Sequence, residues 1–470
     1  MKRYKYYITL LNLLTAILLL VACHDYALPD GQSVAIAETS ATSYLNLHIV
    51  STSTSDTRSS AAEENAVYDG ILCIFEGNSE AEAQLKSATV IDQLVNNPGN
   101  NTSVNITQQL AIGTHPYSGK RYVLALLNTT STGFSVRNGM LFHHGAVLTG
   151  STIDDIKAIK IDSVGSTAEH VGLFMANAPQ SDGTIMPQLS ASYLFDTPEA
   201  ATAGRQLTIN VERAAARVTV SDETTVLRAI FLNGKSNIHP SIHKMTWTLN
   251  NFQQKSYVVR HAPSPYMNWA MSVADTPLSF SASDFSLWPH RSHSNDELYI
   301  AENTNATETE VIVEVQLKDQ NSMLMHHAFV FHPFGEYTEN AFTDFYTSPE
   351  QYIEYLKWGL SPENKMAFGL ENKDNADIFK NATIIVEGDG DVVITLHNYD
   401  FGAEDQARLT NLASFLSAYT TCFHDGKLYY TYKITHSISP DDSRNAVVRN
   451  NAYDLRLTDE SIHHIGRNKP

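Results

Sequence analysis

The sequence predicts a mainly β chain, built from two β-sandwich domains in series with a few helical insertions. Three observations lead to this prediction. Short segments rich in β-branched and aromatic residues recur along the chain, Gly and Asn residues separate them, and long segments with helical periodicity are few. With 470 residues, of which 43% are hydrophobic, the chain is long enough to bury two cores of ordinary size.

The first predicted strand is the clearest. Leu45, Leu47 and Ile49 alternate with polar residues, and this period of two predicts a half-buried strand over 44–50. Further strands are predicted over 67–75, 121–128, 206–213, 214–220, 246–249, 257–259, 310–317, 382–386, 392–396 and 427–434. Helices are predicted over 81–96, 151–160, 348–358 and 405–419. We expect the domain boundary near Ala215.

The N-terminus has the features of an export signal. Three basic residues precede an apolar run over 8–22, and the run ends in Leu-Val-Ala-Cys at Cys23. A membrane-spanning helix needs about 20 residues, so this shorter run favours a signal peptide. The final four residues match the site that a bacterial lipoprotein signal peptidase recognises. We therefore expect residues 1–22 to be removed and Cys23 to carry lipid; the alternative is an ordinary secretory peptide that contains a cysteine.

A cleavable segment is predicted between Cys23 and the first domain. Residues 24–42 are polar and small, as in a flexible tether, and the strand over 44–50 follows. Residues 51–60 are rich in Ser and Thr around Arg58, which predicts an exposed loop. The predicted organisation is therefore a signal peptide (1–22), a lipidated tether with the first strand and loop (23–58), an N-terminal sandwich (59–215) and a C-terminal sandwich (216–470).

Composition excludes some classes of function. The formal net charge is −19, which argues against binding to nucleic acid. Besides Cys23 the chain has Cys73 and Cys422, each within an apolar or aromatic run. They are either two buried free thiols or one disulfide, which an exported protein allows. No CxxC pattern is present.

No motif points to an enzyme, a metal or a cofactor. Adjacent histidines, as at 143–144, 326–327 and 463–464, point to opposite faces of a strand and cannot share one metal. Residues 387–391 resemble part of a calcium loop but lack its spacing, which favours a turn between strands. Aromatic groups at 266–269 and 285–288 could stack on sugars, although packing is the expected role. Carboxylates are numerous, and none is singled out as catalytic.

Four stretches resemble one known family. They are 43–58, with a strand followed by an arginine; 207–218, with a VERxxAR element; 242–260, with a tryptophan and a Tyr-Val-Val strand; and 426–455, which pairs GKLYY with VVRNNAY. The chain is therefore similar to the fimbrillins, or type V pilins, of Gram-negative gut and oral bacteria, and in particular to the shaft subunits of minor fimbriae. The resemblance is spread over most of the chain, and its last stretch is the most specific.

The resemblance implies transthyretin-like, Greek-key sandwiches and a structural role. It implies export to the outer membrane as a lipoprotein held by Cys23, and cleavage after Arg58 by an Arg-specific protease. Cleavage would release the lipid with the strand that carries Leu45, Leu47 and Ile49, and a strand of another fimbrial subunit would fill the groove. The subunit would then belong to an extracellular fimbrium, a homopolymer or heteropolymer, with a receptor on a host or bacterial surface.

The free energy of burying this strand agrees with assembly by strand exchange. Three fully buried aliphatic side chains contribute together about 5–9 kcal/mol, comparable with the net stability of a domain. A domain without the strand would expose an apolar groove and an open sheet edge, which favours polymerisation.

The chain differs from the shaft subunits of this family in one respect, and two alternative functions remain open. The sequence ends with residues 465–470, soon after its last predicted strand, so few residues remain that could serve as a donor strand for another subunit. This favours a tip or accessory subunit over a shaft subunit. The alternatives are an uncleaved outer-membrane anchor that keeps Cys23, and a stand-alone surface lipoprotein that binds glycan or protein through its second domain.

Overall fold

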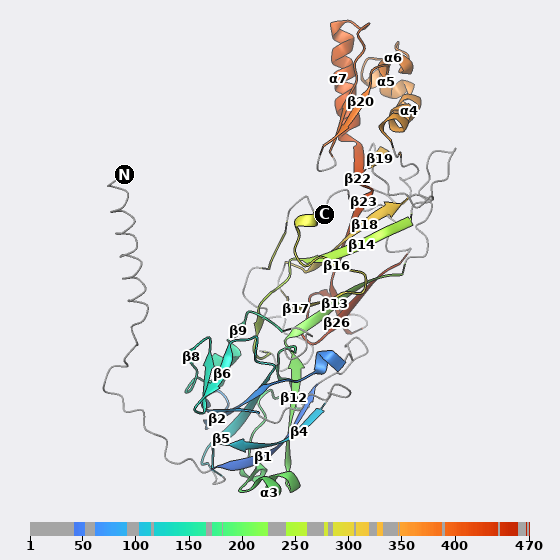
Figure 1. Cartoon of the computed structure of the whole chain (residues 1–470). Helices are drawn as coiled ribbons and strands as arrows, with labels where there is room; N and C mark the ends of the chain where they lie inside the picture. The colour runs from blue at the N-terminus through green and yellow to red at the C-terminus, as the bar shows by residue number, and fades with distance from the viewer. Residues whose placement is uncertain are drawn as a thin grey trace, which may run out of the picture. The chain divides into compact units, whose positions relative to one another are not determined.

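The computed structural model describes residues 42–51, 62–91, 103–113, 117–165, 172–180, 182–223, 241–260, 277–280, 285–304, 307–318, 327–331, 346, 348–387, 391–439, 442–458, 467 and 470. All of them belong to one unit, Thr42–Pro470, which Figure 1 colours from blue to red along the chain. The described chain is mainly β, as predicted, with several sheets and a smaller share of helix.

An eight-stranded sheet contains most strands of the first half of the chain. Its order is β11–β1–β12–β10–β5–β2–β3, and β4 pairs with β1 outside this path. The strands are β1 (Ser43–Ser51), β2 (Gly70–Gly77), β3 (Gln84–Val90), β4 (Ser103–Leu110), β5 (Lys120–Leu127), β10 (Met175–Asn177), β11 (Leu194–Phe195) and β12 (Gln206–Arg213).

This sheet folds over its own apolar core. Leu47 of β1 and Ile74 of β2 lie far apart along the strand order, and yet they belong to the same buried cluster. Both faces of β2 and β5 are buried, because alternate residues such as Cys73 and Leu124 face a second cluster. The continuous apolar runs over 67–75 and 121–128 of the sequence agree with this burial of both faces. The second cluster is covered by β6 (Phe134–Arg137), β7 (Met140–His143) and α2 (Ile153–Lys157).

The chain leaves this sheet at Ala214. The sequence predicts that the strand over 214–220 continues the one before it, but β12 and β13 (Ala215–Asp222) belong to different sheets. Ala214 itself is buried, and its amide donates to the carbonyl of Phe174. The domain boundary near Ala215 stays a prediction, and this change of sheet is consistent with it.

Two sheets share the main core of the second half. One has the order β17–β13–β26 and the other β16–β14–β18–β23. Trp247 of β14 and Val218 of β13, both 0% exposed, lie in the cluster that both sheets enclose. The bounds are β14 (Ser241–Asn250), β16 (Ser292–His293), β17 (Glu297–Ala301), β18 (Glu310–Lys318), β23 (Lys427–Lys433) and β26 (Ala452–Leu457). Short pairs are β9 (Lys160–Ile161) with β15 (Ser256–Tyr257), and β24 (Thr435–Ser439) with β25 (Asp442–Asn445).

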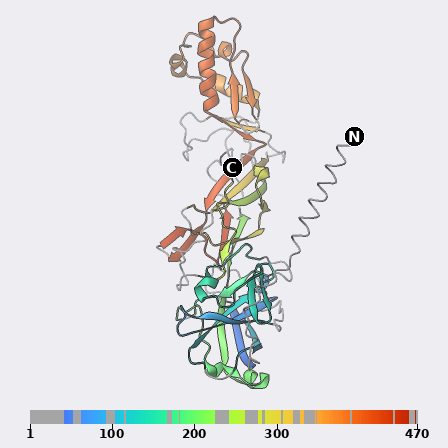
Figure 2. The same ribbon diagram turned by 90° about the vertical axis from the view of Figure 1, so that its left-hand side faces the viewer.

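A helical insertion, residues 348–418, lies between two paired strands, β19 (His327–Phe331) and β22 (Thr420–His424). It contains α4 (Pro349–Gly359), α5 (Pro362–Ala367), α6 (Asn375–Ile378), β20 (Thr383–Val386), β21 (Val392–Thr395) and α7 (Ala403–Ala418). Figure 2 shows α7 running beside the β20–β21 hairpin. α4 and α5 each begin with Ser-Pro: the serine caps the helix and the proline occupies its first turn.

The helix predictions have mixed outcomes. α4 and α7 confirm the helices predicted over 348–358 and 405–419, and α2 is a shorter form of the one over 151–160. The helix predicted over 81–96 is wrong, because residues 84–90 form β3 in register with β2. Leu85 and Ala88 of β3 are buried in the core beside β2, so sheet pairing outweighs helix propensity there. α3 (Pro198–Ala203), α5 and α6 were not anticipated.

Candidate functional site

The first strand is an interior strand of its sheet. Residues 43–50 pair antiparallel with β4, in register from Leu110 to Ser103. On its other edge β1 pairs first with β11, through Tyr44 and Leu45, and then runs parallel to β12. The strand predicted over 44–50 is therefore present, and it separates β4 from β12 (Figure 1).

The inward face of β1 is fully buried. Leu45 and Leu47 are 0% exposed and Ile49 is 2% exposed. They pack in the core cluster with Ile106 and Leu207 of the neighbouring strands and with side chains from across the fold, such as Ile74. Without β1 these partners would line an apolar groove between β4 and β12.

The outward face of β1 carries a polar row. Asn46 lies directly between Gln206 of β12 and Thr107 of β4. The Gln206 Nε2 donates to Asn46 Oδ1 at 3.2 Å and to Asn105 Oδ1 at 2.8 Å. The Asn46 amide donates to the carbonyl of Thr202, at the end of α3, at 3.5 Å. One side chain of β1 is thus bonded to the strand on one side and to the helix that follows β11.

The described residues on either side of 52–61 are joined by a hydrogen bond. Ser51 Oγ, at the end of β1, donates to Asn65 Oδ1 at 3.0 Å. Asn65 closes a short 3₁₀ helix, Ala62–Asn65. Arg58 falls between these two points and, like Cys23, lies outside the described residues, so the cleavage and lipidation sites stay predictions.

Glu64 is the centre of a buried ion-pair network. Its carboxylate pairs with Arg213 at the end of β12 and, at 3.3 Å, with Arg217 of β13. The Tyr299 hydroxyl donates to Glu297 at 2.6 Å and lies 3.1 Å from Glu64. Burial, followed by the bond to Glu297, raises the pKa of Tyr299 well above its usual value, so it stays a neutral donor.

Two stretches of the family resemblance, the VERxxAR element and the more specific VVRNN segment, meet in this network. Arg213, from the VERxxAR element, donates through Nε to Asn450 of the VVRNN segment at 2.9 Å. Glu212 holds Arg260 with two bonds of 2.8 and 2.7 Å, and both side chains are buried. Arg449 donates to the carbonyl of Tyr257 at 2.8 Å. Residues that are distant in sequence therefore fix the passage from the first sheet to the second half of the chain.

Several of these positions have no distinct signal in the sequence. Glu64 stands in an acidic pair of a short polar segment, and Gln206 and Thr202 stand in an unremarkable stretch. Arg260 was part of a resembling stretch, but its partner was not specified. Only pairing across the sheet gives these side chains a role.

The remaining candidates have structural roles or no assigned one. Cys73 and Cys422 are buried free thiols, and burial raises the pKa of Cys73 far above its usual value. Phe285 and Trp288 pack into a small apolar cluster rather than facing solvent. Glu387 follows β20 and Asp391 precedes β21, and the Glu387 amide donates to the Asp391 carbonyl at 2.8 Å; residues 388–390 lie outside the described residues. The group at 266–269 lies outside the described residues.

No metal centre is found among the residues that the structure describes: no three His, Cys, Asp or Glu side chains converge there. The prediction that adjacent histidines point to opposite faces is wrong at 143–144: the two rings lie 4.3 Å apart, because His144 follows β7 with a φ of 48°. None of the described helices is both long and apolar enough to cross a membrane.

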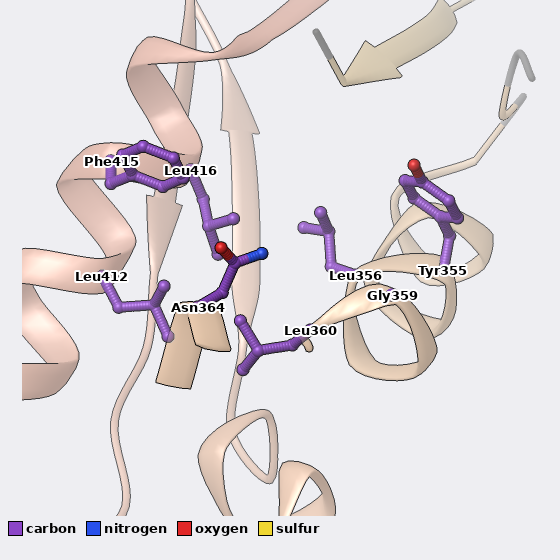
Figure 3. Close-up of a pocket in the computed structure, with 8 residues that line it drawn as sticks. All are labelled: Tyr355, Leu356, Gly359, Leu360, Asn364, Leu412, Phe415 and Leu416. Carbon is purple, nitrogen blue, oxygen red and sulfur yellow. The ribbon is translucent and has the colours of Figure 1, made fainter. Parts of the chain in front are cut away.

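One small pocket lies in the helical insertion. Its volume is about 40 Å³, and leucines of α4 and α7 line it. Figure 3 shows Asn364 of α5 between the two groups of leucines. We assign no ligand to this pocket.

Comparison with known proteins gives structural neighbours only. No family model matches the chain, and no curated protein matches its sequence. Among solved structures, a candidate cell adhesion protein from Parabacteroides distasonis is similar over 58% of this chain and 75% of its own, with 14% identity and a TM-score of 0.34. The tip fimbrial protein Mfa3 from Porphyromonas gingivalis is similar over 60% of this chain and 79% of its own, with 12% identity and a TM-score of 0.31. A fimbrial assembly protein from Parabacteroides distasonis covers 59% and 84%, with 12% identity and a TM-score of 0.31.

Proposed function

We propose that this chain is a structural subunit of a bacterial surface fimbria that is assembled by strand exchange. The precursor is exported and held at the outer membrane by lipid on Cys23. Cleavage after Arg58 by an Arg-specific protease separates β1 from the rest of the chain. A strand of another subunit then takes the place of β1, and the assembled fibre serves in adhesion.

The position of β1 carries this proposal. It is the first described strand, it precedes the segment that contains Arg58, and it is interior to its sheet. A cut in that segment leaves β1 held only by noncovalent contacts. Since both of its edges are paired, its departure leaves two unpaired strand edges beside an apolar groove, and a new strand restores both.

The network around Glu64 supports the same proposal from the other side of the cut. Glu64 lies six residues beyond Arg58, and its carboxylate is buried against Arg213 and Arg217. A chain that begins at Ser59 would therefore keep its new N-terminal segment fixed to the strands on both sides of Ala214. The strand that is released, β1, ends shortly before Arg58, and the buried Glu64 that stays behind follows shortly after it.

The N-terminus of the surface form tests this function. We expect mass and N-terminal sequencing of protein sheared from cells to give a chain that begins at Ser59. A chain still lipidated at Cys23 on assembled fibres would rule out the cleaved-subunit mechanism, and would instead support an uncleaved anchor. An Arg58→Ala variant is expected to accumulate as a membrane-bound precursor.

The helical insertion favours a tip or accessory position within the fibre. Trp358 and Tyr399 are each 83% exposed, and Ile385 and Val393 are directly paired on the exposed face of their hairpin. Exposed apolar groups of this kind suit contact with a receptor, which a fibre needs at its end rather than along its shaft. The same observation favours the second candidate function, a stand-alone lipoprotein that binds glycan or protein.

A further inference from the structure

The strand that replaces β1 must satisfy two different faces. The inward face requires aliphatic side chains at the positions of Leu45, Leu47 and Ile49, because these are buried. Alternation of apolar and polar residues is common to most half-buried strands, so this face alone selects weakly. Selection among strands must come from the outward face.

The outward face has one specific hydrogen-bonding position. At Asn46 the neighbouring groups offer both a donor and an acceptor: the amide of Gln206 donates, and the carbonyl of Thr202 accepts. A side-chain amide has both an acceptor oxygen and donor hydrogens on one carbon, which matches this pair. His48, two residues further, faces Thr208 and Asn105 and bonds with none of the described side chains.

The partners of Asn46 are themselves held in place. Thr202 donates through its hydroxyl to the carbonyl of Pro198 at 2.8 Å and lies 2.8 Å from the hydroxyl of Thr107. Gln206 is bonded at the same time to Asn105 on β4. Residues of β4, α3 and β12 therefore form a frame around one position of β1.

We propose that this frame selects the incoming strand, and that its partner is an extended segment of another subunit with a side-chain amide at the position of Asn46. Such a segment runs parallel to β12 and antiparallel to β4, as β1 does, with aliphatic residues on either side of the amide. This inference rests on the proposed function, because it specifies the partner of the same groove.

A peptide-binding experiment tests the selection. A full chain with a highly specific protease site in place of Arg58 is cut, and its own β1 is removed in mild denaturant. Binding of a labelled peptide with the sequence of β1, Ser43–Ser51, is then measured by fluorescence anisotropy. We expect an Asn46→Val peptide to bind about fivefold more weakly than the native peptide, the loss of a typical net hydrogen bond.

The choice of valine makes the test sharp. Val has a higher strand propensity than Asn. If the affinity of the groove depended only on strand propensity and on the alternation of apolar and polar residues, the Asn46→Val peptide would bind as tightly as the native peptide or more tightly. That result would overturn the proposal. The matched control is His48→Val, which makes the same change on the same face and is expected to bind at least as well as the native peptide. A peptide with residues 46 and 48 exchanged keeps the composition and should bind as weakly as Asn46→Val.

Failure of strand exchange is distinguishable from failure of this selection. If even the native peptide does not bind, the proposed function fails, and the frame is then tested in the intact chain. There Asn46→Val should speed hydrogen exchange of the β12 amides over 206–211 about fivefold, and His48→Val should leave them unchanged. Equal exchange in the two variants would show that the frame does not discriminate.

Discussion

The strand β1 is stabilised by contacts with segments distant in the sequence, whereas the helical insertion is stabilised mainly by contacts within itself. Leu47 of β1 has cross-strand partners at Ile106 and Leu207, so the strand depends on segments far away in the sequence. The insertion, residues 348–418, is a continuous segment, and its helices and hairpin share a core that includes Leu356 and Leu409. It joins the rest of the described chain through the pair β19–β22.

This difference bears on two questions: whether another strand can replace β1, and whether the surface of the insertion can change without disturbing the sheet. If the segment after β1 is cut as proposed, β1 is held only by its two paired edges and its buried face, and another strand can take its place. A continuous segment with its own core can change its surface without disturbing that ladder. Under the proposed function, assembly would depend on the residues around β1, and adhesion would depend on the surface of the insertion.

The largest effect is expected at the buried ion pair that fixes the segment following Arg58 to β12. Arg213→Met leaves Glu64 buried without its principal partner, which should lower the free energy of unfolding by about 3–5 kcal/mol. Chemical denaturation measures this loss. The double variant Arg213→Met with Glu64→Leu removes both charges and should recover much of it. An Arg213→Met variant of native stability would mean that the pair does not hold the segment.

A pair of leucine variants compares the two regions directly. Leu47→Ala and Leu409→Ala each remove a fully buried side chain and should each cost about 2–5 kcal/mol. Hydrogen exchange should separate them: Leu47→Ala should speed exchange in β4 and β12, and Leu409→Ala should do so in α7 and β21. Acceleration of the same amides in both variants would contradict the independence of the two regions.

Release of β1 should have a local consequence for β4. Among the described residues β4 has no strand partner except β1, whereas β12 also pairs with β10. After cleavage and removal of β1, the amides over 103–110 should exchange nearly as fast as in an unfolded chain, while those of β2 and β5 stay protected. Persistent protection of β4 would show that its buried side chains, Ile106 and Leu110, hold it without the ladder.

The smallest effect on stability is expected on the surface of the insertion. Trp358→Ala removes a side chain that is 83% exposed, so the free energy of unfolding should change by less than about 0.5 kcal/mol. If this face contacts a receptor, adherence of cells that display the variant should fall nevertheless. Glu354→Ala, one turn earlier on the exposed side of α4, is the matched control. Equal adherence of both variants and the native chain would place the receptor contact elsewhere.

The sequence by itself determined the local features of this protein. The alternation of Leu45, Leu47 and Ile49 identified β1, and the helical pattern over 348–358 identified α4, because these patterns depend on neighbours in the chain. The buried runs of β2 and β5 were also evident from composition.

Only the tertiary structure decided which segments meet. Residues 84–90 have a composition that suits a helix, but they form β3 because β2 offers them an edge. Glu64, Arg213 and Asn450 converge, and Gln206 reaches Asn46, through pairings between segments up to hundreds of residues apart. A polar side chain takes its role from the partner it finds in the fold, and periodicity along the chain does not contain that information.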